Sequence, residues 1–242
     1  MLFDDELLTE FADSFFGYGS YCGKYWFVGM EEGGGDSFTD INHRLNVWNE
    51  RGKQELEDLA MYHQRLGAGC FFNDKPKLQR TWHKLIRIYL SAKGEDVSTT
   101  RVREFQKSTL GRKESDIALL ELLPLPSPST KHWFYAQHSE LSHLAARDIY
   151  HNYYALKRAT HIKQRVKHHK PKVVVFYGKG YKEWWQAIAD NELHEEKELG
   201  ILKGRSRFTL FIVTKHPVAM GVTNNYFQEI GQAIAQHNFR SK

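Results

Sequence analysis

The chain has 242 residues, 41% of them hydrophobic, and a formal net charge of +5, which is enough for one large domain or two small ones with a proper core. No apolar run reaches the roughly 18 residues of a membrane span, and the acidic start MLFDDELLTEF does not resemble a secretory signal. Two cysteines without a CxxC pair exclude a disulfide framework and a four-cysteine iron–sulfur cluster, and they predict a cytoplasmic setting.

The first half of the chain is organised around YWFVGMEEGGG at residues 25–35. A short apolar run before glycines is typical of a buried parallel strand. Residues 4–16 carry apolar positions at helical spacing and are predicted to form a helix before it. Residues 33–51 are expected to be irregular and residues 53–66 helical. Residues 77–93 form the clearest amphipathic helix; its basic face is interpreted as solvated in preference to a phosphate contact.

In the second half, DIALLELL at 116–123 is a second predicted strand. It runs into PLPSPST at 124–130, a stiff segment whose hydroxyls could hold a phosphate backbone; the alternative is a rigid connector. A long helical stretch at 138–169 has a basic end, and its apolar side is predicted from positions that include Ile149 and Leu156. Strands at 173–177 and 208–214 follow, with a short helix between them, and a final helix runs from 223 or 224 to 239.

Strands alternating with helices predict a single α/β domain over residues 1–242, a three-layer α/β/α sandwich around a mainly parallel four-stranded sheet. Polar side chains follow each of the four strands. They are Glu31 with Glu32, Glu121, Lys179 and His216. Because the carboxyl ends of parallel strands share one edge, we expect these groups to form one site there.

The ordered set GMEEGG, ELLPLPSPS, VVVFYGKG and HPVAM resembles the uracil-DNA glycosylase superfamily, whose members carry a first motif of the type G-x-[DN]-P-[YG] and a late H-P-S-x-L loop. The resemblance covers about residues 25–231 in motif order and spacing. It implies the glycosylase α/β/α sandwich and hydrolysis of the N-glycosidic bond of a base flipped out of DNA. No metal or cofactor is expected, since His161, His168 and His169 lack ligand spacing.

By this resemblance, Glu31 falls where the family has its water-activating Asp or Asn. Glu32 replaces the family's proline, which leaves open which of the two acids is catalytic. His216 matches the histidine that stabilises the negative charge on the departing base. Phe38 or Trp48 could stack on the flipped base, or either could belong to the core.

The predicted DNA contacts are Ser127, Ser129, Lys179, Lys215 and Met220. Met220 falls at the position of the family's wedge leucine, and methionine is among the apolar side chains that can fill a gap in a duplex. A core methionine is the alternative. Val218 stands where the late motif has serine, which puts one phosphate contact in doubt.

Two positions indicate which base is the substrate. The uracil-specific branch of the family places a tyrosine where Gly33 stands, so glycine there predicts a pocket that admits a substituent at C5. Glu121 lies near the family's uracil-reading asparagine. When ionised, it would accept a hydrogen bond from cytosine N4 and repel uracil O4. The expected substrate is therefore a 5-substituted cytosine, such as the glucosylated hydroxymethylcytosine of some phage DNA, with a role in antiphage defence. Alternatively, Glu121 is protonated or ion-paired and structural.

Three other functions stay open at this point. One is a glycosylase for uracil or other deaminated bases, and a second is a DNA-binding relative without catalysis. The third is an unrelated hydrolase that uses Glu31 and His216 on a small molecule. The expected partner is DNA, either a duplex with a flipped base or a single strand, bound by a cytoplasmic monomer without membrane contact.

Overall fold

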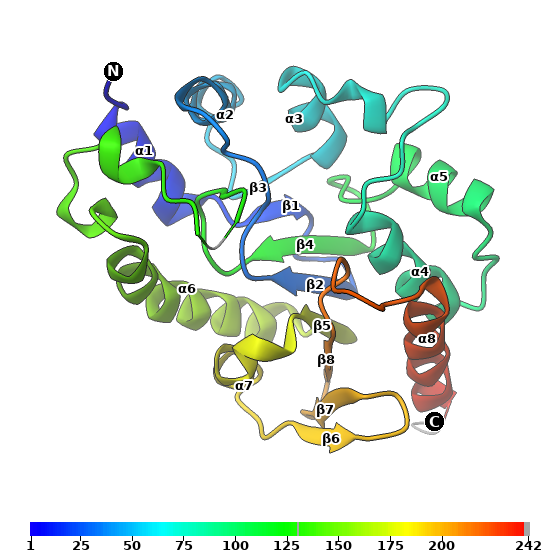
Figure 1. The fold of residues 1–242 in the computed structure, drawn as a ribbon. Coiled ribbons are helices and arrows are strands. Elements are labelled where there is room, and N and C mark those ends of the chain that lie inside the picture. The colour runs from blue at the N-terminus through cyan, green and yellow to red at the C-terminus, as the bar shows by residue number, and fades with distance from the viewer. Residues whose placement is uncertain (130, 240–242) are drawn as a thin grey trace.

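The computed structural model describes residues 1–129 and 131–239, and its strands form one eight-stranded sheet in the order β3-β1-β4-β2-β5-β8-β7-β6 (Figure 1). Thr130, in the hydroxyl-rich loop, lies outside the described residues. The four central strands are parallel to one another: β4 (Ile117–Glu121), β2 (Tyr25–Gly29), β5 (Val173–Tyr177) and β8 (Leu210–Thr214). The α/β/α architecture with a parallel core is confirmed, whereas the predicted number of four strands is wrong.

The additional strands extend both edges of this core. β1 (Gly17–Gly19) pairs antiparallel with β4 and parallel with β3 (Leu56–Glu57), while β7 (Ile201–Arg205) pairs antiparallel with β8 and with β6 (His194–Glu196). β1 has the sequence GYG and β6 the sequence HEE. Neither is the kind of apolar run by which the central strands were predicted, so no local pattern marks these two strands.

Helices cover both faces of the sheet (Figure 1). α6 (Arg147–His169) and α7 (Lys182–Ala189) lie on one side, and α4 (Trp82–Ala92) and α8 (Asn224–Phe239) on the other. Because both faces are covered, β2, β5 and β8 are buried along their whole length. The remaining elements are α1 (Asp5–Ser14), α2 (Phe38–Glu50), α3 (Leu59–Arg65), α5 (Thr99–Ser108) and the short 3-10 turns η1 (Gly69–Phe71), η2 (Tyr135–Gln137), η3 (Ser142–Leu144) and η4 (Lys179–Tyr181).

α2 corrects the prediction that residues 33–51 are irregular. The Ser37 hydroxyl accepts a hydrogen bond from the Asp40 amide at 3.2 Å and caps the helix. The helix buries Ile41, Leu45, Val47 and Trp48. Trp48 is 0% exposed, so the core interpretation holds for it and base stacking does not.

Several predicted boundaries also move. α4 begins at Trp82 instead of residue 77, because the Gln79 side chain accepts hydrogen bonds from the Thr81 and Trp82 amides and fixes the start of the helix. α6 begins at Arg147 instead of residue 138, after two 3-10 turns. α3 is confined to Leu59–Arg65, and β8 begins at Leu210 instead of residue 208.

The buried face of α6 differs from the predicted one. Ile149 and Leu156 are 45% and 64% exposed. The inward face carries larger amphipathic side chains, above all Arg158, which is 1% exposed. Its guanidinium donates hydrogen bonds to the carbonyls of Ala12, Phe15, Glu121 and Leu122. Arg158 therefore ties α1 to the end of β4, where the predicted site begins.

Among the described residues, no helix is long and apolar enough to cross a membrane. Cys22 and Cys70 are both exposed free thiols.

Candidate active site

The register of the sheet brings the ends of the four central strands to one level. Gly29 of β2 pairs with Glu121 of β4, and Tyr177 of β5 pairs with Thr214 of β8. Val28 pairs with Phe176, so Gly29 and Tyr177 are also level. The residues that follow these strands therefore emerge side by side at the carboxyl edge of the sheet, which is where open α/β sheets bind ligands.

Glu121 and Tyr177 cross directly over Gly29. The Tyr177 hydroxyl donates a hydrogen bond to Glu121 Oε1 at 2.7 Å. A Cβ atom on Gly29 would lie 2.2 Å from Tyr177 Oη and 2.3 Å from Glu121 Oε2. The absence of a side chain at Gly29 is thus what allows this pair to lie against strand β2.

The surroundings of Glu121 favour the neutral, protonated form of its carboxyl group. Burial, together with the nearby Glu32 and Glu31 carboxylates, raises its pKa to about 8 against the opposing hydrogen bond from Tyr177. Its Oε2 atom is buried and has no hydrogen-bond partner among the described residues. This shift favours the protonated alternative for Glu121 over the ionised carboxylate that the substrate argument assumed. A neutral carboxyl group donates one hydrogen bond and accepts others.

Glu32 is fixed by three side chains from different parts of the chain. The Tyr18 hydroxyl lies 3.0 Å from both carboxylate oxygens, Arg44 Nη1 is 3.3 Å from Oε2, and His63 Nε2 is 3.3 Å from Oε1. Burial opposes ionisation, but the attraction of Arg44 and His63 prevails and lowers the pKa of Glu32 to about 2. The Glu32 carboxylate is thus fully engaged by protein groups.

Glu31 is held at only one oxygen. Arg147, the first residue of α6, donates to Oε1, while Oε2 is buried without a partner among the described residues. Burial raises the pKa of Glu31, and Arg147 acts against this rise. The Arg147 guanidinium lies 5.7 Å from the ring centroid of Trp133. Of the two adjacent acids, Glu31 is the one with a free oxygen.

His216 follows β8 at the same edge. The Val218 amide donates to its Nδ1 atom at 3.4 Å, which in the neutral ring leaves the proton on Nε2. His216 is exposed, but partial desolvation of its ring lowers the pKa and so favours the neutral form. Its centroid lies 5.8 Å from that of Tyr177. His216 therefore presents a neutral N–H donor next to the Glu121–Tyr177 pair.

The glycine run after β2 has two distinct parts. Gly34 and Gly35 adopt φ values of 110° and 72°, and a Cβ on Gly35 would lie 2.7 Å from the Pro126 carbonyl oxygen. Gly35 thus lets the backbone pass against the proline-rich loop, whereas a Cβ on Gly34 would lie 2.8 Å from Arg44 Nη2. A Cβ on Gly33, in contrast, would meet no atom within 4 Å, so the position next to the acids is open.

The other predicted ligand contacts are placed as follows. Phe38 stacks on Phe3 with ring centroids 4.7 Å apart, which places it in an aromatic cluster. Ser127 is 5% exposed, and its hydroxyl is within hydrogen-bond distance of the Ser129 and His132 carbonyls. That hydroxyl holds the loop together, and the predicted phosphate contact from it is wrong. Ser129 is exposed.

The loop after β8 projects into solvent. Met220 is 100% exposed, which rules out the core alternative for it. Lys215 Nζ lies 5.4 Å from the ring centroid of Tyr226. Lys179 opens the 3-10 turn after β5 and is partly exposed. These three side chains flank the strand ends without an acidic partner among the described residues.

Five residues of this site were missed in the sequence: Tyr18, Arg44, His63, Arg147 and Tyr177. Tyr177 could have been found, because it is the last residue of a predicted strand and faces the end of β2. The others come from β1, α2, α3 and α6, and no local pattern marks them.

Unsatisfied buried polar atoms concentrate here. Six such side-chain atoms occur in the described part of the chain, and three of them are Glu31 Oε2, Glu121 Oε2 and Arg147 Nη1. Buried groups without partners are costly and are typical of sites that bind or react. No three His, Cys, Asp or Glu side chains gather as metal ligands within residues 1–129 and 131–239.

Comparison with protein-family models and with the sequences of curated proteins finds no match for this chain.

Proposed function

We propose that the chain is a DNA glycosylase that flips a modified base out of DNA and hydrolyses its N-glycosidic bond, leaving an abasic site. The observation that carries this proposal is the division of roles between Glu31 and Glu32. Glu32 is immobilised by Tyr18, Arg44 and His63, while Glu31 keeps one oxygen free of protein partners. The order of the strand-end motifs supports the same class.

In the proposed reaction, a base inside a duplex must first be extruded, at a cost of a few kcal/mol. The bond between C1′ and the base nitrogen breaks, and positive charge develops on the sugar. The Glu31 carboxylate stabilises that charge and takes a proton from water as its oxygen bonds to C1′. Arg147 favours the ionised form of Glu31 by opposing the effect of burial on its pKa.

The departing base takes the bonding electrons and carries negative charge. Neutral His216 donates its Nε2–H to this base, an electrostatic contribution that commonly amounts to about 3 kcal/mol. A neutral imidazole suits this role because it stabilises the anion without losing its own proton in the resting site. The Glu121–Tyr177 pair lies beside His216 and reads the edge of the base.

The substrate class follows from Gly33 and Glu121. Open space at Gly33 admits a substituent at C5 of a pyrimidine. The neutral Glu121 carboxyl can pair with a donor next to an acceptor, a pattern that both cytosine and uracil edges present. We therefore propose a 5-substituted pyrimidine, with glucosylated hydroxymethylcytosine of phage DNA as the first candidate and antiphage defence as the role. A glycosylase for uracil-type bases is the second candidate, because a protonated Glu121 can pair with the uracil edge as well.

DNA would be engaged by the exposed groups around the strand ends. Met220 is fully exposed and can enter the gap left by a flipped base. Lys179, Lys215 and Ser129 are available for phosphates. We propose that the protein acts on DNA as a monomer in the cytoplasm, without metal or cofactor.

The direct test is alkali nicking of oligonucleotides that contain uracil, hypoxanthine, 5-hydroxymethylcytosine or its glucosylated form, together with phage DNA that carries the last base. Nicking at the cytosine derivatives that is lost in Glu31→Gln and retained in the surface variant Glu50→Gln supports the proposal. Nicking at uracil alone selects the second candidate.

Two other outcomes overturn the proposal. Tight DNA binding without abasic sites on any substrate would identify a binding module. No affinity for DNA at low salt would identify a hydrolase for small molecules, because phosphate contacts dominate DNA binding.

A further inference from the structure

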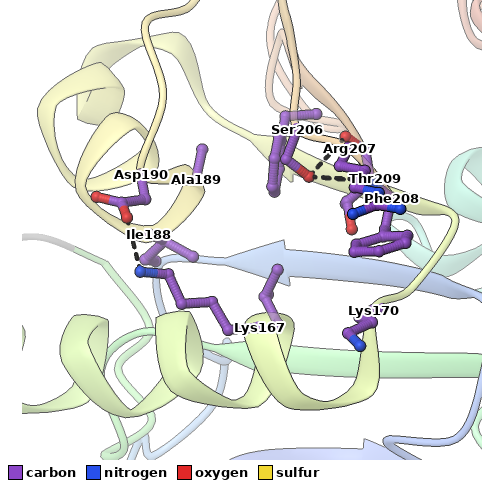
Figure 2. Close-up of a pocket in the computed structure, with 11 residues that line it drawn as sticks. Lys167, Lys170, Ile188, Ala189, Asp190, Ser206, Arg207, Phe208 and Thr209 are labelled. Atoms are coloured by element: carbon purple, nitrogen blue, oxygen red, sulfur yellow. Dashed lines mark hydrogen bonds and ion pairs between the residues drawn. The ribbon is translucent and has the colours of Figure 1, made fainter.

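A hollow of about 270 Å³ opens at the amino ends of the parallel strands, where β5 and β8 begin (Figure 2). We call it the basic hollow. Its apolar wall is made by Val166 of α6, Ile188 of α7 and Phe211 of β8. β5 and β8 end at Tyr177 and Thr214 on the opposite edge, so the basic hollow is separate from the candidate active site.

The charged residues of the basic hollow are only partly paired with one another. Asp190 accepts from Lys167 at 2.7 Å and from Lys163 at 2.6 Å (Figure 2 shows the Lys167 side). These contacts lower the pKa of Asp190 to about 2. Its carboxylate is therefore ionised and is balanced by the two lysines. Lys170 and Arg207 also line the basic hollow, and neither has a carboxylate partner among the described residues.

The two unpaired cations flank an exposed aromatic ring. Phe208 is 51% exposed. Lys170 Nζ lies 4.9 Å and Arg207 Cζ 5.1 Å from its ring centroid. Exposed aromatic rings next to arginine and lysine are the arrangement that binds flat rings by stacking and attached anions by charge.

The backbone sets two of these side chains in place. Lys170 and Asp190 have φ values of 51° and 50°, and they are two of the three non-glycine residues with positive φ in the described part of the chain. They end α6 and α7. Glycine would adopt this conformation without strain, but it would provide neither the ammonium group over Phe208 nor the carboxylate for Lys167.

The electrostatic balance favours an anion. The carbonyl ends of α6 and α7 face this region, and each acts as roughly half a negative charge. The lining residues carry three cations, Lys167, Lys170 and Arg207, against the single carboxylate of Asp190. The cations therefore outweigh the carboxylate and the two helix ends together.

We propose that the basic hollow binds a small anion attached to a flat ring, of the size and chemistry of a nucleoside monophosphate. Its volume lies just below the range of about 300–1,000 Å³ that is usual for small-ligand sites, which limits the ligand to one ring system. The ring packs against Phe208 and the apolar wall, and the anion is bound by Lys170 and Arg207. This site does not depend on the proposed glycosylase activity.

The test is isothermal titration calorimetry of the full chain with AMP, with adenosine and inorganic phosphate as separate arms. We expect AMP to bind at least about tenfold more tightly than either part alone, since the ring and the phosphate each contribute. Arg207→Glu and Lys170→Gly should each weaken AMP binding about tenfold or more. Lys170→Gly suits the left-handed backbone at that position, so it should fold.

Two controls complete the test. Arg103→Glu makes the same charge change at an exposed residue of α5 that has no ion pair among the described residues, and it should bind AMP as the unmodified chain does. Glu31→Gln should also leave AMP binding unchanged, which separates this site from the strand-end site. Binding of AMP no tighter than that of phosphate, or equal losses in Arg103→Glu and Arg207→Glu, would overturn the proposal.

Discussion

The adjacent acids Glu31 and Glu32 should respond in opposite ways to the same substitution. Glu32→Gln removes a carboxylate that Tyr18, Arg44 and His63 surround. Burial disfavours its charge, yet Arg44 and His63 prevail and lower its pKa from an ordinary 4.5 to about 2. At about 1.36 kcal/mol for each pKa unit, Glu32 contributes about 3 kcal/mol to the free energy of unfolding at pH 7.

The pH dependence follows from the sign of the shift. The pKa of Glu32 is lower in the folded state, so its contribution is complete above the unfolded value of 4.5 and is lost as the pH falls through about 2. At pH 3 the difference between the unmodified chain and Glu32→Gln should shrink to about 1 kcal/mol.

Glu31→Gln should have the opposite effect. Burial raises the pKa of Glu31 against the attraction of Arg147, so its charge costs stability above its unfolded pKa. The variant should be as stable as the unmodified chain or slightly more stable at pH 7, and it should lose base release.

Urea unfolding at pH 7 and pH 3, followed by tryptophan fluorescence, measures all three proteins. Glu50→Gln is the matched control, since its ion pair with Arg65 is more than half exposed and should be worth under about 1 kcal/mol. The reasoning would be refuted if Glu32→Gln unfolded at the same urea concentration as Glu50→Gln, or if its deficit stayed constant down to pH 3.

Three further predictions concern Glu121, the glycine run and Met220. Because burial raises the pKa of Glu121 to about 8, its charge costs stability above its unfolded pKa. Glu121→Gln should therefore gain stability relative to the unmodified chain as the pH rises from 5 to 8. A difference in urea midpoint between the two proteins that is the same at pH 5 and pH 8 would contradict this. Gly35→Ala, whose Cβ would lie 2.7 Å from the Pro126 oxygen at a φ of 72°, should lose about 1–3 kcal/mol of unfolding free energy, whereas Gly33→Ala should lose little. Equal thermal midpoints for these two variants would refute the distinction. Gly33→Tyr should fold but reject 5-substituted bases. Met220→Ala should unfold at the same temperature as the unmodified chain, because the side chain is fully exposed. The substitution should slow base release from duplex DNA more than from single-stranded DNA. Equal slowing on both substrates would exclude a wedge.

The parallel core of the sheet could be predicted because each of its strands is a short apolar run followed by a polar loop. β1 could not, since its sequence GYG gains strand geometry only by pairing with β4 and β3. α2 was missed for a similar reason. Its sequence is polar, and the cap at Ser37 and the burial of Trp48 decide its conformation.

The site was predictable as far as it follows the strands. Glu31, Glu121 and His216 were identified because the carboxyl ends of parallel strands meet at one edge. Arg147 could not be identified, because only the tertiary fold brings the start of α6 to Glu31.

The sequence analysis left open whether Glu121 is ionised or protonated. The charge of a carboxyl group in a buried site depends on desolvation and on neighbouring acids. Both act on Glu121 through tertiary packing, with Glu32 and Glu31 as the neighbours.

The central claim is that Glu31 at the strand ends drives hydrolysis of an N-glycosidic bond. Its most direct test is mass spectrometry of the free base released from a duplex with glucosylated hydroxymethylcytosine, compared among the unmodified chain, Glu31→Gln and Glu32→Gln at pH 7. The account predicts release by the unmodified chain, a loss of at least about 100-fold in Glu31→Gln, and retained release by the folded fraction of Glu32→Gln. Equal release by Glu31→Gln and the unmodified chain would contradict it.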